Sequence, residues 1–390
     1  MTAKKKTLII IIIIFILSLI GLFFTYQSFI GDKYNDGIGI ITNRDGINTP
    51  FPNSPQQNVD ENGNIKENGP VPTLRQVSDT PTSGGVVFNT DGDIKIRYVE
   101  RSTGHIFETT SNSLNQVRIS NTTIPRIQKS FWSPDGEMVI LQYVDENEIL
   151  KSFYGEIIEE SGVIEGWFLS NNISDIDVHE DGDIFYIQRI GDSSKGFISN
   201  FDGTNSRSVL SSSIYDWNPQ LTGSLASITT KPSNGIVGFL YLLRPYGYEK
   251  IISDEGLIAS INPEGTKILF SISNTDETNL FVYDMDTKNV STVPFRTLAE
   301  KCVWSDNSSF LCASPYNVIQ NVVPDDWYKG LFSFSDDIWS YNIETETSHL
   351  VFDAEESDNV FDAINLSIDT DGKILLFTNK NNLTLWSLSL

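Results

Sequence analysis

The residues best suited to bind another molecule form one short run, which consists of Asp325, Asp326, Trp327, Tyr328 and Lys329. Aromatic rings offer stacking surfaces and charged groups offer directional contacts, so this run fits a clamp for a glycan or a peptide. It falls within an insertion, at about 314–336, that interrupts a regular series of repeats. Long loops on rigid scaffolds often carry binding residues. The alternative is a loop that packs its own aromatic side chains against the scaffold.

Two cysteines, Cys302 and Cys312, flank a predicted turn near Asn307. In a hairpin centred on that turn they lie opposite each other on the same face, where the separation of cross-strand side chains permits a disulfide. Two free thiols buried in the core fit the same pattern equally well. No histidine is close in sequence to either sulfur, so a nucleophilic cysteine is not expected.

No recognisable motif for metal binding or catalysis is present in the sequence. The histidines, His105, His179 and His349, are scattered, whereas zinc sites need His and Cys ligands that converge. Two turns, at 180–183 and 369–372, resemble calcium loops but lack the ligand series of an EF-hand. The G-x-S-x-G motif of hydrolases is absent as well. We therefore predict no catalytic residues, no metal and no cofactor.

The overall charge restricts the partners that the surface attracts. The chain has 27 Lys and Arg residues against 51 Asp and Glu residues, which gives a formal net charge of -24. Such a surface repels the phosphates of nucleic acids and anionic lipid headgroups, so nucleic-acid binding is not expected. Cationic partners, metal ions and neutral polymers are compatible with this charge.

The N-terminus has the pattern of a membrane anchor. Three lysines at 4–6 precede an almost unbroken apolar run from Leu8 to Phe24. With the stretch to Ile30 this segment reaches the ~20 residues that a helix needs to cross a bilayer. We predict a cytoplasmic stub and a signal-anchor helix over 1–30, with the rest of the chain extracytoplasmic because the lysines stay inside. A cleaved secretory signal is the alternative, although no A-x-A-like site follows the apolar run.

Residues 31–72 have the composition of a flexible linker. Gly, Asn, Asp, Pro and Gln dominate, as in the segment from Asn48 to Pro55. Such a stretch cannot bury enough apolar surface to order itself. The sequence therefore predicts a disordered tether between the anchor and the remaining residues.

Beyond residue 73 the sequence repeats itself, and the clearest unit runs from Phe131 to Tyr143. Its Ser-Pro-Asp-Gly segment suits a type I turn, and apolar runs on both sides indicate a β-hairpin. Variants of this turn recur along the chain, and the glycines at 92, 136 and 182 are 44 and 46 residues apart. A second predicted pair of strands follows most of these hairpins.

Four strands in every 40–45 residues or so is the period of a propeller blade. Seven turn motifs predict an all-β, seven-bladed β-propeller of four-stranded antiparallel blades over 73–390, although six or eight blades fit nearly as well. The last repeat offers only three strands, near 363–368, 373–378 and 382–390. The segment from Leu74 to Ser78 has no partner of its own, so we expect it to complete the last blade and remove an exposed edge.

The pattern of a hydrophobic residue, Trp132-Ser-Pro-Asp-Gly136 and strands such as Leu280-Phe-Val-Tyr-Asp284 resembles the WD-like repeats of TolB-type propellers. That resemblance implies the propeller fold and an envelope partner, and it supplies no catalytic motif. We predict a monomeric, single-pass membrane protein whose extracytoplasmic propeller binds an envelope protein or a glycan as a scaffold module. The alternative is a carbohydrate-active, glycosidase-like enzyme that uses acidic residues in the central channel.

Overall fold

The computed structural model describes residues 71, 73–90, 92–274, 277–316, 322–357 and 359–390. The predicted anchor at 1–30 and nearly all of the predicted linker at 31–72 lie outside these residues. Among the described residues, no helix has the length and apolar character needed to cross a membrane.

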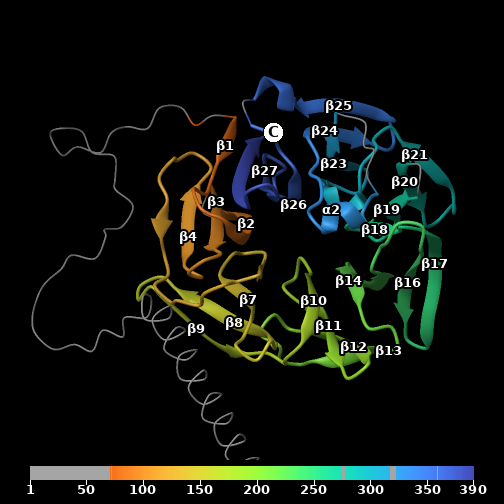
Figure 1. The fold of residues 1–390 in the computed structure, drawn as a ribbon. Helices are drawn as coiled ribbons and strands as arrows, with labels where there is room; N and C mark the ends of the chain where they lie inside the picture. Colours follow the sequence, from red (N-terminus) through yellow and green to blue (C-terminus); the bar gives the residue numbers. More distant parts are fainter. Residues whose placement is uncertain (1–70, 72, 91, 275–276, 317–321, 358) are drawn as a thin grey trace, which may run out of the picture. The chain divides into compact units, whose positions relative to one another are not determined.

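Seven four-stranded antiparallel sheets are arranged around a common centre in the described part of the chain (Figure 1). The predicted seven-bladed propeller is therefore confirmed, including the number of strands in each blade. The inner strands of successive blades, such as β10 and β14, lie nearest the centre, and the strand order follows the sequence in six of the seven sheets.

The strands of the first four blades are β2 (Thr82–Thr90), β3 (Asp93–Glu100), β4 (Ile106–Thr110), β5 (Val117–Arg118), β6 (Lys129–Trp132), β7 (Met138–Val144), β8 (Leu150–Ile158), β9 (Val163–Phe168), β10 (Ile173–Val178), β11 (Ile184–Ile190), β12 (Ser193–Ser199), β13 (Arg207–Ser212), β14 (Trp217–Thr222), β15 (Leu225–Thr230), β16 (Val237–Arg244) and β17 (Gly247–Glu255). The remaining strands are β18 (Ile258–Ile261), β19 (Lys267–Ser273), β20 (Thr278–Asp284), β21 (Val290–Val293), β22 (Cys302–Trp304), β23 (Ser309–Pro315), β24 (Asp336–Asn342), β25 (Thr347–Phe352), β26 (Ala363–Ile368), β27 (Ile374–Asn379), β28 (Thr384–Ser389) and β1 (Leu74–Gln76). Helical turns are limited to η1 (Ala299–Lys301), α2 (Asp325–Tyr328) and η2 (Ala354–Glu356) among the described residues.

The repeated Asp-Gly turns join the first two strands of their blades. The amide of Gly136 donates to the carbonyl of Ser133 at 2.9 Å, and Gly136 has a φ of +70°. Side chains with a Cβ adopt that backbone conformation only with strain, so glycine suits the end of the turn. The same bond, also at 2.9 Å, closes the turns at 179–182, 262–265 and 369–372.

The hydrophobic core is divided among the spaces between neighbouring blades. One cluster, for example, combines Val87 and Ile96 of the first blade with Leu376 and Leu385 of the last. Middle strands are covered on both faces, so they are apolar without alternation, as at 139–141, where all three side chains are fully buried. Inner strands have one face toward the core and one toward the channel.

The ring closes by pairing the first described strand with the last. β1 adds to β28 in the sheet order β1-β28-β27-β26, with Leu74 opposite Leu388 and Gln76 opposite Trp386. The amide of Val77 then donates to the carbonyl of Leu385 at 2.7 Å, and Val77 is buried. The structure thus confirms that the segment from Leu74 to Ser78 completes the seventh blade.

Candidate functional site

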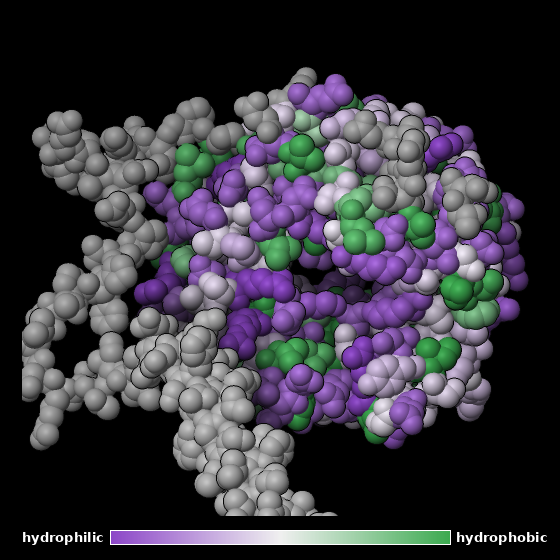
Figure 2. All heavy atoms as spheres, in the orientation of Figure 1, coloured by the Kyte–Doolittle hydropathy of each residue, from purple (hydrophilic) through white to green (hydrophobic). Residues whose placement is uncertain are grey.

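The face of the ring that Figure 2 shows is hollowed at its centre, and mostly hydrophilic residues surround the hollow. On β10 the side chains of Asp175 and Asp177 share one face of the strand, while Ile176 between them is buried in the core. Two residues along a strand separate their Cα atoms by about 6.6 Å. The strand therefore presents two carboxylates in a row.

Asp175 is held between lysines from the two neighbouring blades. Lys129 at the start of β6 lies 3.1 Å from one carboxylate oxygen, and Lys231 after β15 lies 2.8 Å from the other. Burial alone would raise the pKa of Asp175, but the two ammonium groups outweigh it and lower the pKa below the usual value. Asp175 therefore remains ionised and its negative charge is neutralised.

Asp177 lies in the opposite electrostatic environment. Burial raises its pKa to about 7; the amide of Leu221, which donates at 2.6 Å, opposes that shift, and the charge of Asp175 adds to it. No cation pairs with Asp177 in the described part of the chain. Two carboxylates on one strand thus differ in protonation near neutral pH, an arrangement that suits an acid and base pair.

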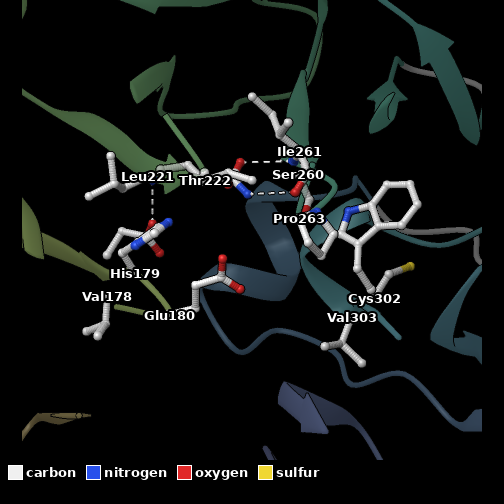
Figure 3. Close-up of a pocket in the computed structure, with 14 residues that line it drawn as sticks. Val178, His179, Glu180, Leu221, Thr222, Ser260, Ile261, Pro263, Cys302 and Val303 are labelled. Carbon is white, nitrogen blue, oxygen red and sulfur yellow. Dashed lines mark hydrogen bonds between the residues drawn. The ribbon is translucent and has the colours of Figure 1, made fainter. Parts of the chain in front are cut away.

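A pocket of about 270 Å³ lies beside Asp177 (Figure 3). The first strands of four blades and the turns after them line it. The lining residues are 177–180, 220–223, 260, 261, 263 and 302–304. The side chain of Glu180 extends into this space and makes no hydrogen bond or ion pair with any described residue. The pocket approaches the size of small-molecule sites and offers unpaired acceptors, but no lysine or arginine lines it.

The insertion between β23 and β24 carries the predicted binding residues, and its short helix α2 lies near the centre of the ring in Figure 1. Trp327 is only 3% exposed and packs edge-to-face on Phe334, with ring centroids 5.4 Å apart. Its indole nitrogen donates to Asp362 at 2.8 Å. Trp327 is therefore part of the core and offers no stacking surface. At this residue the structure matches the alternative, a loop that packs its own aromatic side chains against the scaffold.

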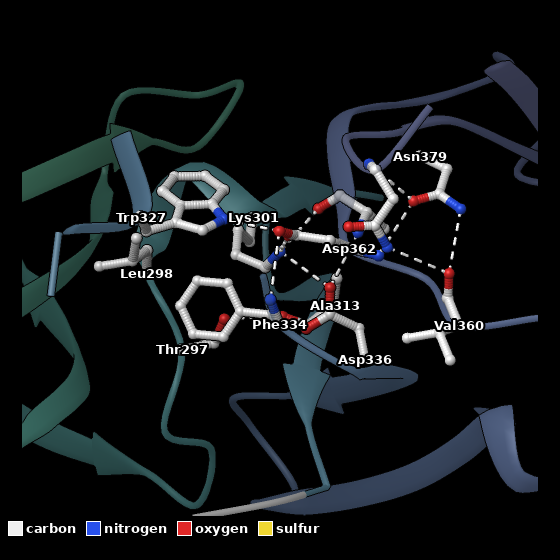
Figure 4. Close-up of polar contacts among 12 residues, drawn as sticks. Thr297, Leu298, Lys301, Ala313, Trp327, Phe334, Asp336, Val360, Asp362 and Asn379 are labelled. Atoms are coloured by element: carbon white, nitrogen blue, oxygen red, sulfur yellow. Dashed lines mark hydrogen bonds and ion pairs between the residues drawn. The ribbon is translucent and has the colours of Figure 1, made fainter. Parts of the chain in front are cut away.

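Trp327 covers a buried ionic group centred on Lys301 (Figure 4). The ammonium group lies 2.8 Å from Asp336 and 2.6 Å from Asp362, and it also donates to the carbonyl of Ala363 at 3.0 Å. Lys301 and both aspartates are fully buried. Burial raises the pKa of Asp336 to about 6, although Lys301 opposes that shift. One ammonium group thus pairs with two carboxylates inside the fold, and this buried set of contacts indicates a structural role.

Of the other four predicted residues, the two aspartates are held by hydrogen bonds, whereas Tyr328 and Lys329 are exposed. Asp325 accepts hydrogen bonds from the hydroxyl of Ser233 at 2.9 Å and from the amide of Asn234 at 2.6 Å, which ties the insertion to the fourth blade. Asp326 accepts from a backbone amide of the insertion itself at 3.3 Å. Tyr328 donates to Glu300 yet keeps almost half of its surface exposed, and Lys329 is exposed without a side-chain partner among the described residues.

The two cysteines lie directly opposite each other on β22 and β23, with Cα atoms 4.0 Å apart, and a disulfide joins them. Cys312 is fully buried, whereas Cys302 contributes to the pocket beside Asp177. The disulfide therefore fixes the edge of that pocket to the core of the sixth blade.

The turns that resemble calcium loops have a simpler explanation in the structure. Asp369 accepts hydrogen bonds from the amides of Lys373 and Ile374 at 2.7 and 2.6 Å, so its carboxylate caps its own turn. No group of three or more His, Cys, Asp or Glu side chains that could hold a metal ion occurs among the described residues.

No protein-family model matches the chain, and no curated protein sequence matches it. Solved structures do. An oligogalacturonate lyase in complex with manganese is 11% identical, covers 81% of this chain and 93% of its own, and has a TM-score of 0.55. The β-propeller domain of the Trilobed protease from Pyrococcus furiosus is 10% identical, with coverages of 79% and 94% and a TM-score of 0.50. TolB from Acinetobacter baumannii is 10% identical, with coverages of 76% and 63% and a TM-score of 0.43.

These likenesses show the fold alone. They confirm the expected resemblance to propeller proteins, and their names include a lyase and a protease, so the fold admits more than one activity. The sequence did not single out Asp175, Asp177 or the Lys301 group, and it pointed to Glu180 only as part of a turn that resembles a calcium loop. The only sequence signal for Asp175 and Asp177 was the alternation of acidic and apolar residues along 173–178.

Proposed function

We propose that the chain is a membrane-anchored, extracytoplasmic recognition module of the cell envelope, which binds a protein or glycan through the face that carries the insertion. One observation carries this proposal: the insertion is fastened to the scaffold while apolar side chains on it stay exposed. Leu331 is 68% exposed, and Val322 and Tyr328 are exposed beside it in the same short segment. Exposed apolar groups of this kind mark interaction surfaces when they cluster.

The anchoring of the insertion supports the proposal because it lowers the entropic cost of binding. Asp325 is bonded to the fourth blade, Tyr328 to Glu300, and the carbonyl of Trp327 accepts from Lys380 of the seventh blade at 2.7 Å. The loop of the fourth blade that Asp325 contacts also exposes Ile236. A partner would thus meet apolar side chains held on two blades within an acidic, hydrophilic face.

The test is capture of a partner from crosslinked, detergent-solubilised membranes by the full-length protein, with mass spectrometry as the readout. We expect Leu331→Asp to reduce capture by about tenfold or more, because it places a charge at the most exposed apolar side chain among the described residues of the insertion. The matched control is Tyr246→Asp, which changes a fully exposed aromatic residue in the turn between β16 and β17. Equal capture by the parent and Leu331→Asp would contradict the proposal.

Deleting the whole insertion would be a poor test of this proposal. Val323, Trp327 and Phe334 belong to the hydrophobic core of the fifth and sixth blades, and Asp336 belongs to the Lys301 group. A deletion would remove these contacts together with the exposed surface. Point changes at exposed positions separate binding from folding.

A carbohydrate-active enzyme is the second candidate, and the contrast between Asp175 and Asp177 favours it. A protonated Asp177 can donate a proton, as the acid of the carboxylate pair does in glycosidases, and an ionised carboxylate, Asp175, lies on the same face of the strand. The measurement is reducing-end release from a panel of soluble oligosaccharides. Activity that Asp177→Asn abolishes, while partner capture is unchanged, would assign the function to the channel instead of the insertion face.

A further inference from the structure

A second cleft lies on the outer part of the ring, between the second and third blades, away from the channel. It has a volume of about 230 Å³, and its lining includes Trp167 of β9, Ser170, and the turn from Asp202 to Thr204 between β12 and β13. β9 is the outermost strand of its blade and lies at the rim of the ring (Figure 1). Neither the insertion nor the channel carboxylates contribute to it.

Trp167 forms the apolar floor of this cleft. One face of its indole packs on Tyr154, with ring centroids 4.7 Å apart, and 49% of the residue stays exposed. Its ring nitrogen donates to the carbonyl of Asp202 at 3.1 Å, which fixes the orientation of the ring. An exposed tryptophan held in this way is a flat, pre-organised platform, which costs little entropy when a ligand stacks on it.

Hydrogen-bonding groups surround the platform and still have free capacity. One carboxylate oxygen of Asp202 accepts from the amide and hydroxyl of Thr204 at 2.8 and 2.6 Å, whereas the other accepts no bond from any described residue. The hydroxyl of Ser170 is exposed and has no partner among the described residues either. The cleft therefore combines one apolar plane with an unpaired acceptor and an unpaired hydroxyl at its edge.

We infer that this cleft binds a neutral pyranose ring, with the C–H face of the sugar on Trp167 and its hydroxyls bonded to Asp202 and Ser170. A pyranose has an apolar face and a polar rim, which is the complement of this surface. Quaternary ammonium ligands need several exposed aromatic walls. Tyr186 also lines the cleft but is only 6% exposed, and the ring of Phe168 packs on Phe153, on the opposite face of the strand from Trp167. A uronic acid would meet the unpaired carboxylate and the acidic surface, which disfavours it.

The direct test is isothermal titration calorimetry of the full-length protein with cellotetraose and with chitotetraose, two neutral oligosaccharides. We expect at least one of them to bind with a dissociation constant below about 1 mM. Trp167→Ala should weaken that binding by about tenfold or more, which corresponds to about 1.4 kcal/mol, because it removes the plane on which the sugar stacks. Trp167→Phe keeps a plane and should recover part of the affinity.

Two further variants keep the outcome clear. Asp202→Asn keeps the bonds of its turn but changes the free carboxylate oxygen, so it should weaken sugar binding while the free energy of unfolding stays near the parent value. Tyr246→Ala, at a fully exposed aromatic residue elsewhere, should leave the affinity unchanged. No heat from either sugar up to about 10 mM, or equal affinity in the parent and a folded Trp167→Ala, would overturn the inference. Leu331→Asp should not alter sugar binding, so failure of the insertion-face proposal is distinguishable.

Discussion

Two groups of carboxylates lie close to the centre of the ring, and they are built differently. Asp336 and Asp362 are fully buried around Lys301, which bonds to both. Asp177 and Glu180 border an open pocket and have no cationic partner among the described residues. Buried charges persist in a fold when opposite charges accompany them, whereas a carboxylate with a raised pKa beside an open pocket is a candidate for a functional role. We therefore interpret the first group as structural and treat the second as a candidate site.

The largest expected effect comes from breaking the buried group. Lys301→Met leaves Asp336 and Asp362 inside the core without a cation, and we expect a loss of about 3–5 kcal/mol in the free energy of unfolding. Chemical denaturation monitored by tryptophan fluorescence measures this change. The matched control is Lys373→Met, whose ion pair with Asp371 lies at the surface and should contribute nothing measurable.

A variant that fails to fold would leave that comparison incomplete, so a triple replacement accompanies it. Combining Lys301→Met with Asp336→Leu and Asp362→Leu removes all three charges from the site together. We expect this variant to recover much of the lost stability, because apolar replacements of a buried ionic group are often nearly neutral. If the single and triple variants are equally unstable, uncompensated charge is not the reason for the loss.

The second effect concerns Asp177 and its pKa of about 7, against 3.8 for an ordinary aspartate. Between those two values the folded protein holds a proton that the unfolded chain has released, so stability falls as pH rises from about 4 to about 7. The shift corresponds to about 4 kcal/mol at most, and we expect about half because the side chain is partly exposed. Asp177→Asn should therefore be about 2 kcal/mol more stable than the parent at pH 8.

Urea denaturation of the parent and Asp177→Asn at pH 4 and pH 8 measures this difference. The gain should disappear at pH 4, where the parent aspartate is already protonated. Asp336, with its own raised pKa, titrates in both proteins and cancels in the comparison. A gain of the same size at both pH values would show that packing, not titration, explains it.

The smallest effect is expected at Asp175, the channel carboxylate that pairs with two lysines. Lys129 is more than half exposed, and Lys231 remains on Asp175 when Lys129 is removed. We expect Lys129→Ala to lower the free energy of unfolding by less than about 1 kcal/mol. Its clearer signature is a higher pKa for Asp175, which NMR titration of the carboxyl carbon would detect. A loss as large as that of Lys301→Met would erase the distinction between the two groups.

The fold was predictable because its signals are local and repeated. The Ser133–Gly136 turn and its variants encode a hairpin within a few residues, and the count of turn motifs in the sequence favoured the seven blades that the structure confirms. The closing strand was predictable as well, because a three-stranded last repeat leaves an edge that Leu74–Ser78 can fill. Each of these inferences needs only neighbouring residues and the count of strands.

The candidate sites were less predictable because they depend on residues that are distant in sequence. Lys301, Asp336 and Asp362 meet only after two blades have folded, and none has a local signature. The sequence pointed to Trp327 because its aromatic ring could stack on a ligand, but the ring packs on Phe334 in the core instead. Whether an aromatic residue in a loop is exposed depends on the surface beneath it, which the sequence does not display.

The pairing of β1 with β28 has a mechanical consequence. Any tension that reaches the ring from residues before position 73 acts first on β1, whose three residues form the outer strand of the seventh blade. Peeling these few bonds away opens the seventh blade, while the other six keep all four of their own strands. The seam that completes the ring is thus also the place where pulling on the N-terminal side would begin to undo it.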